Sequence, residues 1–394
     1  MSSVVPVAVT GMGCLCAAGA DLPSCLETLF RGERHPQPPT RFGSGHPVRY
    51  PVFEVAARLP GDDRFSRTAR LALAAAREAL ADAALSPDEL AGKRVGVCFG
   101  TTVGSAMNNE EFYRQFRDGE HPEMDAIERF LGSNPASVVA REYGLAGPCQ
   151  TVVNACSSGT DAVGIAAAWI RSGICDIVLA GGADELCRVT YNGFISLMIT
   201  DDTPVKPFDR RRKGLNLGEG AAVLVLESED LRHQRSCPAR AFVAGYGSAC
   251  DAYHLTAPHP EGTGLKRALA EALAQSGTSP AEIAFVNAHG TGTPDNDRVE
   301  SRVLAAVLPG VTFLSTKGYT GHTLGAAGAI EAAFTVACLE RGQVPANAGF
   351  AEADPELPVI PVREATAVSG RLALSQSLAF GGNNAVVVFE RGEA

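Results

Sequence analysis

The sequence has no cysteine spacing typical of a disulfide framework or a metal site. Eleven cysteines occur among 394 residues, yet none belongs to a CxxC pair or to a Cys/His cluster with ligand spacing. Most lie in apolar stretches, as in the strand-like start around Cys14 and Cys16, where a reduced cysteine packs as a small hydrophobic side chain. We therefore expect a reduced, cytoplasmic protein without a bound metal.

The chain also lacks a long apolar run and an excess of basic residues. No window reaches the roughly 18 uncharged apolar residues of a membrane-spanning helix, and the first residues do not have the pattern of a signal peptide. With 34 basic and 44 acidic residues the net charge is −10. The sequence predicts neither a membrane span nor a nucleic-acid partner, and an acidic partner needs a local basic patch.

Length and composition indicate a globular enzyme with more than one folding unit. Hydrophobic residues make up 45% of the chain and charged residues 20%. A length of 394 residues exceeds the roughly 100–200 of an ordinary single domain. Two domains or a duplicated unit are therefore expected.

An internal repeat favours the duplicated unit. Residues 79–90 align with residues 272–283 at a constant offset of 193, and each copy reads as the end of a helix, a Ser-Pro turn and then a buried strand. Cys156-x-x-Gly159 is echoed by His322-x-x-Gly325, each opening an Ala-rich helix. Two amphipathic helices can resemble each other by chance, but this number of echoes in register is not expected by chance.

The repeat divides the chain into an N-terminal half, residues 1–235, and a C-terminal half, residues 236–394. Several expected strands are continuous apolar runs, for example 177–180, 221–226 and 385–389. Such strands suit sheets that helices cover on both faces. The sequence predicts an α/β fold of layered sheets and helices, with the active site where loops of the two halves converge.

Cys156 is the candidate nucleophile. The segment 152–159 reads as an apolar strand, a sharp turn and the start of a helix that runs to about Arg171. At a helix N-terminus, free N–H groups and the helix dipole favour the thiolate. Taken alone, a buried structural cysteine is the more common explanation, so the assignment depends on partner residues.

Three further segments supply those partners. His289 ends a buried strand, and His322 opens another helix; neutral imidazoles there can donate hydrogen bonds to a developing enolate oxygen. Phe380 lies in a glycine-rich turn after a strand, where its backbone N–H and that of Cys156 can form an oxyanion hole. The pattern predicts nucleophilic catalysis with stabilisation of an enolate.

The four segments resemble the signature blocks of the elongating β-ketoacyl-acyl-carrier-protein synthases, especially the β-ketoacyl synthase II type, along essentially the whole chain. The resemblance implies a thiolase-like, duplicated five-layer αβαβα sandwich and a decarboxylative Claisen condensation. It implies that Cys156 carries an acyl thioester while His289 and His322 bind the malonyl thioester carbonyl. It implies no bound cofactor, because both substrates arrive on the phosphopantetheine arm of acyl carrier protein.

The resemblance also assigns roles to residues around this centre. Lys317 and Glu331 match a buried ion pair, and we expect Lys317 to organise the site rather than to react, since an unpaired buried lysine is costly. Asp297 and Glu300 match structural acids. Thr291, Thr293 and Thr256 match contacts of the pantetheine arm, although ordinary turn chemistry also explains them. Phe380 matches a gating side chain, and the residues matching the acyl pocket are Phe194 and Val103.

The densest basic stretch of this acidic chain is the candidate docking surface for the carrier protein. It comprises Lys206, Arg210, Arg211, Arg212 and Lys213. Docking of an acidic carrier protein explains it. A solvated run of charges explains it equally well.

Some segments depart from the housekeeping pattern. Ala379 stands where the gating loop usually has glycine, an Asn-Asp pair precedes Arg298, and residues 108–131 are polar and acidic. The Asn-Asp pair resembles ketosynthases of type II polyketide and aryl-polyene pathways. The partner is therefore a second copy of the chain or a chain-length-factor-like subunit, and the pathway is fatty acid or specialised synthesis.

Three alternatives make different predictions for the key positions. A thiolase carries a second cysteine in the last glycine-rich loop, where this chain has Phe380. An initiating synthase pairs its cysteine with one histidine and an asparagine, whereas this chain has His322. A non-catalytic partner subunit lacks the nucleophile, and Cys156 is present.

Overall fold

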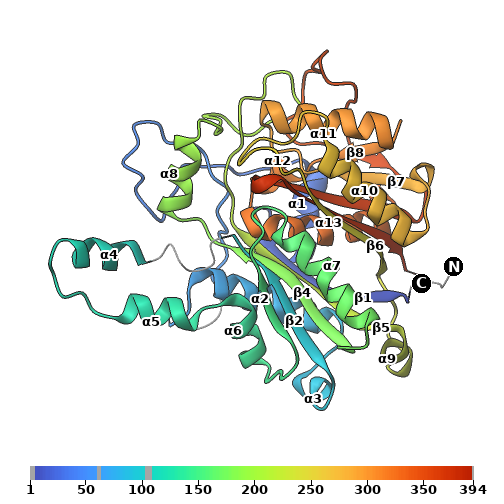
Figure 1. The fold of residues 1–394 in the computed structure, drawn as a ribbon, viewed down its shortest axis with the longest axis horizontal. Coiled ribbons are helices and arrows are strands. Elements are labelled where there is room, and N and C mark those ends of the chain that lie inside the picture. The colour runs from blue at the N-terminus through green and yellow to red at the C-terminus, as the bar shows by residue number, and fades with distance from the viewer. Residues whose placement is uncertain (1–4, 60–63, 103–108, 393–394) are drawn as a thin grey trace.

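The protein is a layered α/β structure in which helices lie between and outside two groups of strands (Figure 1). It is a computed structural model that describes residues 5–59, 64–102 and 109–392. Val103, predicted to line the acyl pocket, lies outside the described residues.

Ten strands form two groups of five with the same order. The first group is β1 Val7–Cys16, β2 Val95–Gly100, β3 Cys149–Val152, β4 Ile177–Asp184 and β5 Gly220–Ser228. The second is β6 Ala241–Cys250, β7 Ile283–Asn287, β8 Thr312–Leu314, β11 Leu372–Ala379 and β12 Asn383–Arg391. The strands run β3-β2-β4-β5-β1-β6-β12-β11-β7-β8, and β1 meets β6 in a short antiparallel contact. A separate pair is β9 Gln343–Val344 with β10 Thr366–Ala367.

The pairing sense repeats as well. From β1 outward the first two contacts are antiparallel and the next two are parallel, and the same holds from β6 outward. Gly11 packs against the carbonyl of Ala79 in the first half, and Gly245 packs against that of Ala272 in the second. The repeat seen in the sequence is therefore a duplication of structure. The boundary near residue 235 stays a prediction.

Helices complete the five layers. The longer ones are α1 Leu22–Arg31, α2 Arg67–Asp82, α6 Pro135–Glu142, α7 Ser158–Arg171, α8 Arg188–Ser196, α10 Thr263–Ser276, α11 Pro294–Val307 and α13 Ala327–Arg341. The shorter ones are α3 Pro87–Leu90, α9 Glu229–Gln234 and α12 Lys317–Thr320. Helices α2 and α6 cover the first sheet, α10 and α11 lie over the second, and α7 and α13 lie between the sheets.

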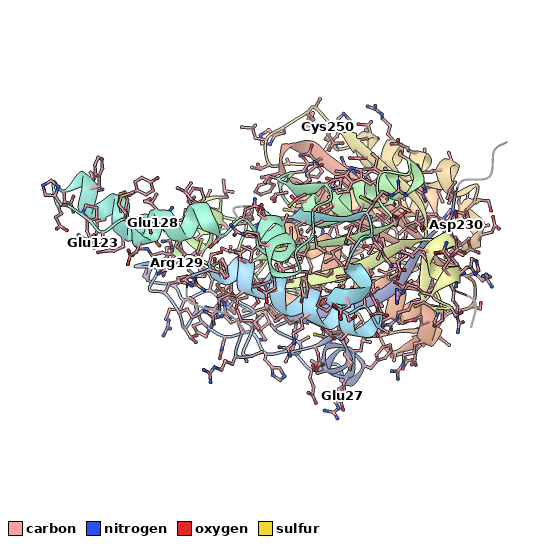
Figure 2. All side chains as sticks on the ribbon, turned by 90° about the horizontal axis from the view of Figure 1, so that it is seen from below. Glu27, Glu123, Glu128, Arg129, Asp230 and Cys250 are labelled. Atoms are coloured by element: carbon pink, nitrogen blue, oxygen red, sulfur yellow. The ribbon has the colours of Figure 1, made fainter. Side chains whose placement is uncertain are left out.

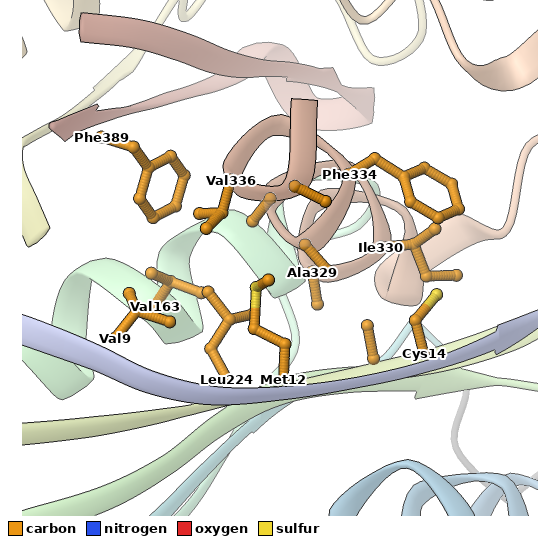
Figure 3. Close-up of a cluster of buried hydrophobic side chains, with 14 of the residues drawn as sticks. Val9, Met12, Cys14, Val163, Leu224, Ala329, Ile330, Phe334, Val336 and Phe389 are labelled. Atoms are coloured by element: carbon orange, nitrogen blue, oxygen red, sulfur yellow. The ribbon is translucent and has the colours of Figure 1, made fainter. Parts of the chain in front are cut away.

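The central layer is built from small side chains. Helices α7 and α13 are rich in alanine and glycine, and Gly159 faces Ala329 so closely that a Cβ would come within 2.6 Å of its nitrogen. Apolar side chains of both sheets enclose this layer (Figure 3). Close contact of the two helices brings the turns before them, which carry Cys156 and His322, to one place.

One helix begins later than the sequence suggests. His322 does not open a helix: a 3-10 turn, Leu324–Ala326, follows it, and α13 starts at Ala327. The start of α7 agrees more closely with the prediction that Cys156 lies at a helix N-terminus. Ser157 is the N-cap of α7, and Cys156 immediately precedes it. The two halves are therefore related in topology but differ at the reactive turn.

Helices α4 Glu110–Arg117 and α5 Asp125–Gly132 form an arm that extends from the body (Figures 1 and 2). Neither helix has a buried residue, and Tyr113, Phe116 and Leu131 are 59%, 66% and 73% exposed. The segment that is polar and acidic in sequence therefore also exposes large apolar side chains. In the described part of the chain, no helix has the length and apolar character needed to cross a membrane.

Candidate active site

Cys156 lies in a tight turn between β3 and α7. Ala155 has a φ of +50°, a conformation that a residue with a Cβ rarely adopts. Ser158 closes the turn: its hydroxyl donates to the carbonyl of Ala155 at 2.6 Å and accepts from the N–H of Asn154 at 2.8 Å. The Cys156 side chain is 4% exposed. The turn thus presents one sulfur atom at a fixed place inside the protein.

Burial has the largest effect on the pKa of this sulfur. Burial raises the pKa of Cys156 to about 11, although the positive charge of Lys317 and the backbone N–H of Phe380 lower it. The expected preference for the thiolate is therefore wrong for the free site. With a pKa of about 11, the Cys156 thiol of the free site is protonated at neutral pH.

His322 contacts the sulfur directly, with 3.1 Å between its Nε2 and Sγ of Cys156. The N–H of Leu324 donates to Nδ1 at 3.2 Å, so the neutral ring carries its hydrogen on Nε2. Burial, reinforced by the charge of Lys317, holds the pKa of His322 well below its usual value. The imidazole is therefore neutral and directs an N–H donor at the reaction centre.

His289 follows β7 and is fixed in the same tautomer. The backbone N–H of His289 donates to Glu300 at 2.6 Å, and its Nδ1 lies 3.0 Å from Nζ of Lys317. Because the ammonium is the donor, Nε2 of His289 carries the hydrogen. Burial and the charge of Lys317 lower the pKa of His289. Its ring centroid is 5.3 Å from that of His322.

Lys317 and Glu331 form a fully buried ion pair, with side chains 1% and 2% exposed. Burial raises the pKa of Glu331 to about 7 in spite of the adjacent ammonium. Lys317 thus binds Glu331 on one side and His289 on the other, which agrees with an organising role.

The two other predicted acids hold the loop after His289. Glu300 accepts from the N–H groups of His289 and Gly290, and Asp297 accepts from the N–H of Phe208 at 2.7 Å. Burial raises the pKa of Asp297 to about 7. Both carboxylates are buried, away from solvent, and bind backbone rather than open space.

A cavity of about 340 Å³ leads to the sulfur and contains most of the predicted site. Its lining includes Cys156, Phe194, Thr256, His289, Thr291, Thr293, His322 and Phe380. A larger hollow of about 1040 Å³ involves α9, β6 and the end of α10 and contains none of these residues. The smaller cavity is therefore the candidate active site.

Two aromatic rings stack across the cavity. Phe194 of α8 and Phe380 lie with ring centroids 5.6 Å apart at an interplanar angle of 15°. Ala379 has a φ of −130°, which any residue adopts, whereas Gly381 has a φ of +83°. Alanine in place of the usual glycine therefore adds no backbone strain in this state of the loop.

Most of the basic stretch is already paired with carboxylates. Lys206 lies 3.4 Å from Asp201, and Arg210 lies 2.7 Å from Glu352. Arg211, 64% exposed, lies near the same glutamate. Lys213 is exposed and also lines the cavity of Cys156.

Arg212 does not belong to a docking surface. Its side chain is 5% exposed, and its guanidinium binds Asp354 at 2.6 Å and lies 3.9 Å from Asp297. A buried guanidinium paired in this way stabilises the fold around the histidine loop and is not available to a partner. The assignment of Arg212 to carrier-protein docking is therefore wrong.

The fold brings together ligand-type atoms that sequence spacing does not reveal. Within the described residues, Cys156, His289 and His322 place one such atom each within 4.8 Å of one another, and so do Cys14, Cys16 and Cys25. In the first group the ammonium of Lys317 opposes a further cation. The second group offers three sulfur ligands where a structural zinc takes four.

The sequence analysis missed two buried acids near the site. Asp184 ends β4 and accepts from Thr101, Thr102 and Gly325, so that it fixes the turn after His322. Asp161 lies in α7 beside the Cys156 turn. Each of these acids is an acidic residue in an otherwise apolar strand or helix, and this could have been noticed in the sequence. An acidic side chain in such a place must be buried together with a hydrogen-bond or charge partner.

Comparisons with known proteins agree with this geometry. Residues 54–231 match the family described as the β-ketoacyl synthase N-terminal domain, and residues 240–351 match its C-terminal domain. The 3-oxoacyl-acyl-carrier-protein synthase 2 of Synechocystis sp. is 32% identical over 407 residues, covering 98% of both chains. The synthase of the same name from Staphylococcus aureus is 32% identical over the full length of both.

Solved structures similar to this chain include ketosynthases determined together with a chain length factor. The ishigamide ketosynthase/chain length factor superposes with a TM-score of 0.93 at 32% identity, covering 99% of this chain and 100% of that one. A ketosynthase in complex with its chain length factor from Xenorhabdus doucetiae has a TM-score of 0.85 at 30% identity, covering 98% of each chain. Fold, catalytic geometry and full-length similarity together show that this chain is a member of the β-ketoacyl synthase family.

Proposed function

We propose that Cys156, His289 and His322 carry out a decarboxylative Claisen condensation between an acyl group and a malonyl group, both delivered by acyl carrier protein. The observation that carries the proposal is the 3.1 Å contact between Sγ of Cys156 and Nε2 of His322, with His289 beside it in the same cavity. A nucleophile and two neutral N–H donors at one point meet the needs of both half-reactions.

In the first half-reaction the acyl group moves from the carrier to the enzyme. The sulfur of Cys156 attacks the thioester carbonyl, the bond to the pantetheine sulfur breaks, and the proton of the Cys156 thiol leaves with the pantetheine thiol. Negative charge develops on the carbonyl oxygen, which the backbone N–H groups of Cys156 and Phe380 bind. The N–H of Phe380 already points at the sulfur.

In the second half-reaction malonyl thioester loses its carboxylate as CO2. The electron pair of the broken C–C bond becomes an enolate whose oxygen accepts hydrogen bonds from Nε2–H of His289 and His322. The enolate carbon then attacks the Cys156 thioester, the new C–C bond forms, and the Cys156 thiolate leaves. Neutral imidazoles suit this step because they donate without requiring a proton from solvent.

Lys317 acts through His289. Its ammonium holds the tautomer that presents Nε2–H, and Glu331 keeps that charge in place. Thr291 and Thr293 bind the amide groups of the pantetheine arm; this is supported by their place in the cavity, where their hydroxyls lie 2.8 Å apart. Thr256 lines the same cavity.

Acyl carrier protein docks at the members of the basic stretch that reach solvent, namely the half-buried Lys206 and the exposed Arg210, Arg211 and Lys213. Lys213 supports this most directly, because it is exposed and lines the cavity of the nucleophile. One solved relative is a type II polyketide ketosynthase in complex with its acyl carrier protein, similar to this chain with a TM-score of 0.90 at 28% identity.

The enzyme acts with a second subunit of the same fold, either another copy or a chain-length-factor-like chain. The arm of α4 and α5, which extends from the body (Figure 2), supports this proposal because its side chains Tyr113, Phe116 and Leu131 are exposed. The pathway is fatty acid elongation or a specialised polyketide or polyene synthesis. Native mass of the purified protein, alone and with a candidate partner, followed by an acyl-length series, distinguishes these possibilities.

The test of the reaction is direct. The enzyme is incubated with acyl and malonyl carrier proteins, and mass spectrometry follows the acyl adduct on Cys156 while CO2 release is measured. Cys156→Ala should abolish the adduct and the condensation, whereas Cys156→Gln should abolish condensation and retain decarboxylation. Cys149→Ala removes an exposed cysteine and should change neither. Full condensation by Cys156→Ala would refute the proposal.

A further inference from the structure

A buried carboxylate beside the Cys156 turn connects that turn to the other half of the fold. Asp161 lies in the first turn of α7 and is 3% exposed. One of its oxygens accepts from Nδ2 of Asn154 at 2.7 Å and from Oγ of Ser157 at 2.8 Å. The other accepts from the hydroxyl of Tyr246 at 2.7 Å. Three neutral donors therefore converge on one carboxylate.

Two of these donors flank the nucleophile. Asn154 precedes and Ser157 follows the pair Ala155-Cys156, in which Ala155 has a φ of +50°. A non-glycine residue in that conformation is strained and persists only where its surroundings impose it. By binding the side chains on both sides, Asp161 imposes the turn that aims the sulfur of Cys156.

A carboxylate is the side chain that the three donors require. Each of the two oxygens accepts at least one hydrogen bond, whereas asparagine at this position would direct its NH2 group at a donor. The Ser157 hydroxyl has one hydrogen and a second acceptor, the carbonyl of Asn154 at 3.0 Å, but Asp161 is the nearer. Burial and the charge of Asp161 raise the pKa of Tyr246 well above its usual value, which keeps the phenol protonated as a donor.

Tyr246 belongs to β6, in the half that also carries the two histidines. Its backbone N–H donates to Gln275 at 2.7 Å. Its ring packs on α7 at Gly164, where a Cβ would come within 2.3 Å of the ring, so glycine makes room for the tyrosine. The hydrogen bond from the Tyr246 hydroxyl to Asp161 thus connects the C-terminal half to the Cys156 turn of the N-terminal half.

We propose that Asp161 and Tyr246 are positioning residues that hold the Cys156 turn in register with His322 and His289. This role rests on the proposed function, because it concerns the alignment that acyl transfer uses. It explains why a polar network lies in an otherwise apolar layer of α7 and β6. Neither residue touches the substrate; both act through the backbone on either side of Cys156.

The test uses Tyr246→Phe, which removes one hydroxyl and keeps the ring on Gly164. Two rates are measured: alkylation of Cys156 by iodoacetamide, followed on its peptide by mass spectrometry, and single-turnover acyl transfer from acyl carrier protein. Both should fall about tenfold, because a hydrogen bond to a charged group is lost at the turn, while KM for the carrier protein changes less than twofold. Asp161→Asn should lower both rates further.

The matched control is Arg171→Met. Arg171 also connects α7 to β6, since it donates to the carbonyl of Val243 at 2.6 Å, but it lies at the far end of the helix. Asp161 and Arg171 are ten residues apart in α7, which separates the two contacts by about 15 Å along the helix. This variant should lower the midpoint of thermal unfolding and leave alkylation of Cys156 within twofold of the unaltered enzyme.

Two results would overturn the proposal. The first is that Tyr246→Phe retains both rates within twofold of the unaltered enzyme. The second is that Arg171→Met slows alkylation as much as Tyr246→Phe does, because the slower rate would then reflect only a general loss of stability. Alkylation needs no acyl substrate. An enzyme without condensing activity whose alkylation still depends on Tyr246 would refute the proposed function alone.

Discussion

Replacing Lys317 by methionine separates stability from catalysis at the centre of the site. The change removes the ammonium that binds both Glu331 and His289. Both of these side chains are buried, so water cannot replace the lost contacts. A carboxylate left without its partner in the interior costs about 3–5 kcal/mol of the free energy of unfolding. Thermal or urea unfolding of Lys317→Met should show a loss of that size at pH 8.

The loss should depend on pH with a definite sign. Burial raises the pKa of Glu331 to about 7 even with Lys317 present, above the roughly 4.3 of an unfolded chain, and removal of the ammonium raises it further. A raised folded-state pKa contributes stability that is present at low pH and is lost as the pH rises through that value. The variant should therefore be closest to the unaltered protein near pH 5 and weakest above pH 7.

A second substitution should restore stability but not activity. Lys317→Met/Glu331→Leu removes both charges, and an apolar pair of similar volume is often as stable as a buried ion pair. Nδ1 of His289 still lacks its donor, so malonyl decarboxylation should remain about a hundredfold below normal in both variants. Stability of Lys317→Met equal to that of the unaltered protein at pH 8, or full decarboxylation by the double variant, would refute this reasoning.

Other predictions follow from the same geometry. The rate of Cys156 alkylation should keep rising with pH toward the pKa of about 11, and a plateau near pH 8 would contradict the burial argument. Because His289 and His322 have folded-state pKa values below those of an unfolded chain, stability should fall as the pH drops below about 6.5, measured by urea unfolding. Phe380→Ala removes the stack across the cavity and should speed labelling of the sulfur by a bulky maleimide severalfold; an unchanged rate would exclude Phe380 as a gate. Lys213→Glu should raise KM for carrier protein severalfold at low salt without changing the melting temperature, and an unchanged KM would remove Lys213 from the docking surface.

The duplicated architecture was predictable because it depends on local patterns. The apolar runs of β4, β5 and β12 are visible in the sequence, and so are two Gly-x-Gly pairs, Gly11 with Gly13 and Gly245 with Gly247, which lie within β1 and β6. Helix packing explains why those glycines recur, since a Cβ at Gly13 or Gly247 would meet the carbonyl of a covering helix. The exact start of the helix after His322 was not predictable, because a 3-10 turn held by Asp184 replaces its first residues.

The basic stretch shows where sequence reasoning fails. Five cations within eight residues look alike in a sequence, but their partners come from segments as distant as Asp297 and Asp354. Those contacts bury Arg212 and leave Lys213 exposed. The exposed apolar side chains of the α4–α5 arm could not be recognised in the sequence either. An aromatic residue in a helix can face the core or the solvent, and only the packing of the helix decides which.

The sequence by itself determined which residues are the candidates for catalysis, since Cys156, His289, His322 and Phe380 lie in short segments whose residue types already indicate the proposed chemistry. Only the tertiary structure decided their states. The charge of the Cys156 sulfur depends on burial and on Lys317, which lies 161 residues away, and the tautomers of the two histidines depend on the donors at their Nδ1 atoms. Protonation follows from the surroundings of an atom in space, and a linear sequence does not specify them.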